Sequence, residues 1–402
     1  MKILNGCGFS LRGLKIPVFA FSLVLSVSPA SGESIDDVAL RILDRAPSLR
    51  SLSLENEAQR ISSLTETNLP DPELEGEYLA APAGESDRWS LSLGWSIDWP
   101  GVYAARRKEA KELEIINRTS EKVARNKTMI EIRRLLLDYI LAVRTSALYD
   151  EMSAANDSVA MLAEKGLRGG EMTRLDLSKL RLERLSLEAS RVEAQDNMQA
   201  SIVALSAIYG ADCSPLLVSL DCDFPAVEAP DETTFNGMSA DEREAAAALG
   251  LARLSESTAA RESLPGISLA LRHAFEDGAH FNGGSLGLSI PLFSNKDRRK
   301  AAKAAVKASE YRLECANADR LTGIEVSLKR LCKLKNQVEA ISVLLADTDE
   351  SDLLMKAYKG KVITLIEYLN ERNYFLEARL THLALLHALA NARLDLDDYL
   401  SL

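Results

Sequence analysis

A stretch without a single glycine or proline runs from Val102 to Lys165. Alanine, glutamate, lysine, arginine and leucine dominate it, and these residues favour helix. As one helix it would be roughly 95 Å long, at about 1.5 Å per residue. A helix of that length extends beyond an ordinary globular core, so it needs partner helices, as in a coiled coil or a helical barrel. A second such stretch spans Asp297–Lys359, with one glycine at Gly323.

Shorter helices are expected over Ile35–Thr67, Arg174–Tyr209, Ala240–Glu262 and Leu365–Leu400. The composition agrees, because 21 glycines, 12 prolines and 5% aromatic residues in 402 positions favour helices over a β-rich fold. A hydrophobic content of 47% argues against disorder throughout the chain. The net charge of −11 argues against a nucleic-acid binder.

The first 32 residues have the pattern of a secretory signal peptide. Lys2, Arg12 and Lys15 precede the apolar run Ile16–Leu25, and small residues follow it. The run is shorter than the roughly 20 apolar residues of a spanning helix. No cysteine lies at the expected cleavage point, so lipidation is not expected there. The mature chain should be exported, without a membrane-spanning helix.

Two strand-like segments interrupt the helices. In Trp89–Trp99, apolar residues alternate with Ser90, Ser92, Gly94, Ser96 and Asp98, and this period of two predicts a strand. About 9–11 residues is the length with which a β-barrel strand crosses a bilayer, and aromatic residues at strand ends resemble an interfacial girdle. A soluble sandwich strand with one buried face is the alternative.

The whole chain is an internal repeat. Ser92–Ile97 matches Ser285–Ile290, and the tripeptide Arg106–Lys108 matches Arg298–Lys300. We therefore expect two structural repeats, 33–238 and 239–402, each with the order helix, hairpin, long helix, tight turn, helix. The expected strands lie near 73–80, 88–99, 266–275 and 284–293, and the expected helix tips near 166–175 and 358–366.

Four stretches in this order resemble the TolC-like family of outer-membrane efflux proteins. They are Leu69–Leu74, Ile97–Arg107, Gly170–Asp176 and Tyr358–Arg379. The second tip departs from the first, because Glu367 follows Gly360 by one residue more than Asp176 follows Gly170.

The resemblance implies a mainly α fold with a β-barrel contribution. Each chain would give four strands to a shared twelve-stranded barrel of a homotrimer, which continues into a periplasmic α-helical barrel. Four strands cannot close, and open sheet edges are not tolerated in lipid, so several chains are needed on physical grounds. Two chains would reach eight strands, so the number three comes from the resemblance.

The implied function is a passive exit duct in the outer membrane, working with a periplasmic adaptor and an inner-membrane pump. No catalysis, cofactor, metal or nucleic-acid partner is expected, because no nucleophile elbow, phosphate loop or metal signature occurs. The alternative is a periplasmic coiled-coil adaptor, or a structural protein without a barrel. The two hairpins distinguish the duct from both.

In the duct, one face of the first repeat's strand would contact lipid: Trp89, Leu91, Leu93, Trp95 and Trp99. The small residues between them would line a water-filled bore. The basic clusters Arg106–Lys108 and Lys296–Lys300 would contact headgroup phosphates, unless they are ordinary solvated helix starts.

The tips are candidates for adaptor docking, with plain turn chemistry as the alternative. The docking candidates are Gly170, Met172, Thr173, Leu175, Gly360, Val362, Ile363, Thr364 and Leu365. Gly166, Gly169 and Gly170 are expected to permit the first chain reversal, and Gly360 the second. Asp176 and Glu367 would form carboxylate rings that select cations, with Arg174 and Lys361 as candidate partners. Ordinary solvated charges on a helix face are the alternative for these residues.

Cys213 and Cys222 lie in a loop-like segment, where an oxidising periplasm leaves a disulfide open. Cys315 and Cys332, on one helix, are too far apart to pair. His273, His280, His382 and His387 are not expected to be metal ligands.

Overall fold

The computed structural model describes residues 32–399 apart from 83, 85, 170–171, 229–234, 236, 292–296 and 347–349. Most of the expected signal peptide, Gly170 and Lys296 therefore lie outside the described residues. Within them, no helix combines the length and the apolar character that crossing a membrane requires.

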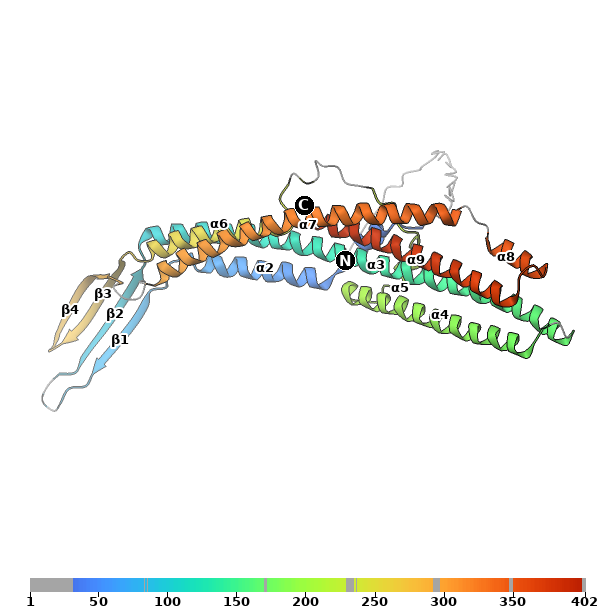
Figure 1. Cartoon of the computed structure of the whole chain (residues 1–402). Helices are drawn as coiled ribbons and strands as arrows, with labels where there is room; N and C mark the ends of the chain where they lie inside the picture. Colours follow the sequence, from blue (N-terminus) through green and yellow to red (C-terminus); the bar gives the residue numbers. More distant parts are fainter. Residues whose placement is uncertain are drawn as a thin grey trace, which may run out of the picture.

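A helix, hairpin, long helix, turn, helix order occurs twice (Figure 1). The first half contains α1 (Ile35–Arg45), α2 (Pro47–Thr65), β1 (Glu73–Leu79), β2 (Arg88–Ile97), α3 (Pro100–Arg168), α4 (Arg174–Tyr209) and α5 (Ser214–Leu217). The second half contains α6 (Ala240–Arg261), β3 (Gly266–Glu276), β4 (Ala279–Ser289), α7 (Arg298–Ala346), α8 (Glu350–Lys359) and α9 (Leu365–Asp397). The mainly helical fold with four strands is the one predicted.

The first expected helix is divided. It breaks at Ala46, whose ψ of 116° is not helical, and Pro47 begins α2. Proline disfavours helical backbone in the residue before it and itself suits the first position of a helix. In the second long stretch the structure describes α7 and α8, and residues 347–349 between them lie outside the described residues. By contrast, α3 is a single helix of 69 residues.

The four strands form one antiparallel sheet in the order β1-β2-β3-β4. Asp277 and Gly278 alone connect β3 to β4, and both have positive φ, 46° and 81°. A two-residue turn with φ above zero at both positions suits the right-handed strand twist, and Asp-Gly favours it. Strand β4 therefore begins at Ala279, earlier than the expected start near 284, and ends at Ser289.

The helices form an elongated wall with the sheet at one end (Figure 1). Near the sheet, α2 packs on α3, α3 on α6, and α6 on α7. Towards the other end, α4 packs on α3, α3 on α9, and α9 on α7. One rim of the wall is therefore β1, α2 and α4, and the opposite rim is β4 and α7. We call these the first rim and the second rim.

Two of the buried clusters hold this wall together. One lies where α1 and α5 cover the middle of α3, around Ile42, Ile132 and Leu136. The other lies where α3, α4 and α9 approach their tips, around Val159, Leu180 and Leu369.

Candidate functional site

The sheet register places the expected lipid-facing residues on one face. Leu93 lies opposite Leu74 on one side and Leu271 on the other, so their side chains share that face. Trp89, Leu91, Leu93 and Trp95 are all 37–45% exposed in the single chain. Trp99 shares this exposure but follows β2, as the capping residue of α3.

Aromatic side chains lie towards both ends of this apolar face. At the end far from the helices, the Trp89 ring stacks on Phe275 at 6.4 Å and lies 5.4 Å from His273. His273 stacks in turn on His280 at 5.3 Å. At the helical end, the Trp95 Nε1–H donates to the Pro70 carbonyl at 2.6 Å. An apolar band between aromatic belts is the pattern of a membrane strand.

The opposite face carries charge as well as small residues, and sequence reasoning missed this. Arg272 lies 3.3 Å from Glu77 and donates to the Ser90 hydroxyl at 3.0 Å. Arg88 pairs with Glu276 at 2.9 Å. These contacts join strands from both repeats, so the alternation within one strand gave no sign of them.

The two candidate gate carboxylates have the same local structure. Asp176 accepts hydrogen bonds from the backbone N–H and the hydroxyl of Thr173, and Glu367 does the same with Thr364. In both cases the threonine hydroxyl accepts from the backbone N–H of the acid, which completes a capping box. These hydrogen bonds hold the pKa of both carboxyls below their ordinary values.

The extra residue of the second tip lies in the turn between Gly360 and Thr364, before the capping box that matches the one in the first tip. Helix α8 ends with hydrogen bonds from Val362 N–H to Ala357 O at 2.9 Å and from Lys361 N–H to Tyr358 O at 3.0 Å. This is a Schellman motif, and Lys361 takes its left-handed position with φ 58°. The expectation that Gly360 makes this reversal is therefore wrong, because the left-handed residue is the next one.

The structure divides the docking candidates by burial. Thr173, Leu175, Gly360, Val362 and Thr364 are exposed, and Leu175 and Val362 reach 64% and 78%. Leu365 is buried, and Ile363 and Met172 are half-buried in the tip cluster.

Met172 joins the two tips of the chain. Its Sδ lies 3.7 Å from the Tyr358 hydroxyl, and a Cβ on Gly166 would lie 2.9 Å from its Cγ. The side chain therefore contributes to holding the tips together.

A buried arginine lies behind the tips, and sequence reasoning missed it. Arg372 of α9 is 5% exposed, donates to Glu183 of α4 at 2.8 Å and approaches Asn156 of α3 at 3.5 Å. Asn156, itself fully buried, donates to the Leu180 carbonyl at 3.1 Å. A charged residue within the leucine-rich α9 was the available signal. We call Arg372, Glu183 and Asn156 the Arg372 node, and it connects α3, α4 and α9 close to the tips.

The basic clusters differ in burial and in ion pairing. Arg106 and Arg298 both pair with Glu262, at 2.9 and 2.8 Å, and the Arg106 side chain is half-buried whereas that of Arg298 is exposed. The neighbouring residues Arg107, Lys108 and Arg299 are exposed as well.

The disulfide left open by the sequence is not formed in the structure. Cys213 is buried, and its Sγ accepts a hydrogen bond from the Ser206 hydroxyl at 3.2 Å. Cys222 is directed towards the Leu220 carbonyl at 3.7 Å. Both are free thiols, because each side chain is held by its own local contacts.

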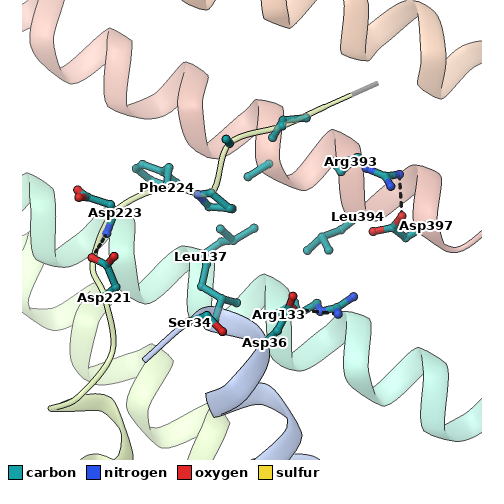
Figure 2. Close-up of a pocket in the computed structure, with 15 residues that line it drawn as sticks. Ser34, Asp36, Arg133, Leu137, Asp221, Asp223, Phe224, Arg393, Leu394 and Asp397 are labelled. Atoms are coloured by element: carbon teal, nitrogen blue, oxygen red, sulfur yellow. Dashed lines mark hydrogen bonds and ion pairs between the residues drawn. The ribbon is translucent and has the colours of Figure 1, made fainter. Parts of the chain in front are cut away.

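A cavity of about 380 Å³ lies at mid-length between α1, α3, α9 and the segment 221–227 (Figure 2). Leu137, Phe224 and Leu394 line it with apolar surface. Arg133 pairs with Asp36 at 2.9 Å, and Arg393 with Asp397 at 2.7 Å. Burial raises the pKa of Asp397, although Arg393 and Arg133 oppose this. Both arginines of the cavity wall thus already face a carboxylate.

Neither a protein-family model nor a protein of curated function matches the sequence. Solved structures match the fold. The CmeC outer membrane channel of Campylobacter jejuni superposes with a TM-score of 0.76 at 15% identity, over 92% of this chain and 85% of CmeC. The open MtrE outer membrane channel of Neisseria gonorrhoeae gives 0.74 at 17% identity, over 91% and 88%. The chain has the TolC-like outer-membrane channel fold.

A membrane protein of Pseudomonas aeruginosa superposes equally well, with a TM-score of 0.75 at 17% identity over 91% of this chain and 89% of that one. These matches cover 91–92% of this chain and 85–89% of the other chains, so the likeness extends over nearly the whole fold. Sequence identities this low establish the fold, and the function must be argued from the site.

Proposed function

We propose that this chain is one subunit of a homotrimeric exit duct in the outer membrane. Its helices would extend into the periplasm, towards a periplasmic adaptor and an inner-membrane pump. The pump would supply the energy, and the duct would carry cargo passively without catalysis. The observation that carries this proposal is the open wall, in which the described residues leave one rim uncovered along each side, from the sheet towards the tips.

The sheet rims require further copies in lipid. Strands β1 and β4 each pair on one side only within the described chain, so each leaves a row of backbone groups for another strand. Hydrocarbon does not satisfy such groups, and single-chain outer-membrane barrels use eight or more strands. Three copies would give twelve strands, the number implied by the family resemblance.

Among the described residues, the helical part of the first rim also lacks a partner on its outer side. On α4, large apolar residues with high exposure follow a seven-residue repeat: Leu175, Leu182, Leu185, Val192 and Val203. They are 44–68% exposed, and this spacing is the seam that a coiled coil buries. The proposed partner is α7 from the second rim of a neighbouring copy, together with the α8 that follows it.

The apolar face between aromatic belts supports placement in the outer membrane. On the helical side, exposed Arg107, Lys108 and Arg299 would reach the inner-leaflet phosphates. The exposed tip residues Val362 and Leu175 would dock the adaptor's helices.

The carboxylates of the two capping boxes support a charged entrance to the duct. Three copies each of Asp176 and Glu367 would surround the narrow end of the duct. Since their pKa values are held low, they stay ionised at neutral pH and would favour cations.

A conductance measurement tests this function. Purified mature protein would be reconstituted in planar bilayers, and crosslinking would count the subunits. Trimers with steady or gated cation-selective conductance are expected. A protein that stays in solution without detergent and gives no conductance would favour the periplasmic adaptor or structural alternative.

A further inference from the structure

The ends of α3, α6 and α7 next to the sheet meet at one carboxylate, that of Glu262. This residue caps α6 just before β3, and its side chain is only 9% exposed. Arg106, in the second turn of α3, donates from Nε and Nη2 to Oε1 at 3.2 and 2.9 Å. Arg298, the first residue of α7, places Nη1 2.8 Å from Oε2. One carboxylate thus holds the helix that follows each hairpin and the helix that precedes the second hairpin.

Arg106 extends this node to the end of β2. Its Nη1 lies 3.0 Å from Asp98, the residue after β2. Asp98 in turn donates its backbone N–H to the Tyr103 hydroxyl at 3.0 Å. Burial opposes the charge of Arg106, but the carboxylates of Glu262 and Asp98 outweigh it and raise the pKa of Arg106. The guanidinium therefore remains charged at this half-buried position.

The entry to β1 is tied in a different way. Pro70, which precedes β1, accepts the indole hydrogen bond of Trp95 on β2. Arg261, beside Glu262, donates to the Gly101 carbonyl at 3.1 Å, which adds a second link between α6 and α3. The Glu262 node therefore joins the ends of α3, α6 and α7 next to the sheet, and Asp98 connects it to the end of β2.

We propose that Glu262 is a positioning residue that fixes the direction of the sheet relative to the helices, so that a neighbouring copy can join both at once. The second half of this statement rests on the proposed function. Each rim contains a strand and a helix, and one neighbour must pair with both. A sheet that swings about its connecting segments would align with the neighbour's strand or with its helix, but not with both. Removing one partner of a buried ion pair leaves charges uncompensated, so the node should be sensitive to a single change.

The positioning itself is tested in the full mature chain, independently of any trimer. Spin labels at Leu91 of β2 and Lys122 of α3, in a cysteine-free background, report the distance between sheet and helix. We expect a narrow distribution, which Glu262→Gln broadens. Glu310→Gln is the matched control, because Glu310 pairs with Arg253 at 3.2 Å between the same two helices, α6 and α7, at an exposed position. A narrow distribution in E262Q would overturn the proposal.

Assembly is tested by the yield of crosslinked trimer in vesicles, alongside the thermal melting of the helices. We expect E262Q to lower the trimer yield about tenfold with helix melting unchanged, and E310Q to leave both unchanged. A parallel fall in melting would show a merely stabilising residue, and normal trimers from E262Q would refute the assembly role. If wild type and E310Q also form no trimers, the proposed function fails, and the label distances still decide the positioning role.

Discussion

At the scale of single residues, the tips combine residues that stabilise the helix ends with one residue in an unfavourable backbone conformation. Thr173 and Thr364 each supply the hydroxyl that a helix start prefers, and an acid three residues later completes the box. Lys361 occupies a left-handed position where glycine has no Cβ to clash. The second tip therefore retains backbone strain that the first turn of α9 does not relieve.

Replacing Lys361 with glycine should stabilise the second tip by about 0.5–1 kcal/mol, because the left-handed strain disappears. Amide hydrogen exchange in α8 and the start of α9 should slow accordingly. Lys359→Gly, within the last turn of α8, is the control and should accelerate the same exchange. Faster exchange in K361G would contradict the strain argument.

Breaking the buried node should cost far more than breaking an exposed ion pair on the same helix. Arg372→Met leaves Glu183 unpaired and should lower the free energy of unfolding by about 3 kcal/mol. Arg379→Met removes a bidentate pair with Glu151 whose side chains are 42% and 49% exposed, and should cost less than about 1 kcal/mol. Urea unfolding followed by circular dichroism checks both. Equal losses of unfolding free energy in the two variants would contradict the difference between the buried and the exposed ion pair.

The lowered pKa values of Asp176 and Glu367 define a pH window. Because ionisation is favoured in the folded tips, the capping contribution is complete above the unfolded pKa values, about 3.9 and 4.3, and is lost as pH falls below them. Cation selectivity, read as a reversal potential, should therefore be constant between pH 7 and about pH 5. The double variant Asp176→Asn with Glu367→Gln should lower selectivity at pH 7. Selectivity that declines already near pH 6 would point to other groups.

At the scale of elements, the apolar repeat on α4 carries a prediction about assembly. Leu182→Asn with Leu185→Asn should abolish trimers and leave monomer helicity intact, because both side chains are more than 60% exposed in the single chain. Ser186→Asn, on the exposed surface beside this seam, is the control. Sedimentation in detergent distinguishes the species. Intact trimers in the double variant would exclude this seam as the contact.

The local sequence pattern predicted most helices and strands, whereas contacts between residues far apart in the chain could not be predicted from it. The alternation of Trp89–Ile97 and the helix-forming run of α3 specify their own structure, and both were predicted correctly. The Arg372 and Glu262 nodes join residues far apart in the chain, so no spacing indicated them. The break before Pro47 and the Asp277–Gly278 turn did have local signals, a proline and an Asp-Gly pair. Long periodic runs of residues do not reveal such short signals.

At the scale of the whole molecule, two neighbouring positions test which sheet face meets lipid. Leu91→Arg should prevent stable insertion, because a charge near mid-membrane costs about 2–4 kcal/mol per copy. Ser92→Arg, on the opposite face, should insert normally and lower cation conductance. Membrane flotation separates the two variants, and bilayer recording measures the second. If the Ser92 face met lipid instead, Ser92→Arg would prevent insertion and Leu91→Arg would insert normally.

The Asp277–Gly278 turn limits what the outer end of such a molecule can do. Two residues cannot fold across the mouth of a pore, and the other outer connection, between Leu79 and Arg88, is also short. Among the described residues of the proposed duct, nothing long enough to cover the outer opening lies at this end, so antibodies or phages would find little polypeptide there to bind. We therefore expect closure of the duct to act from inside the cell envelope, at the far end of the helices.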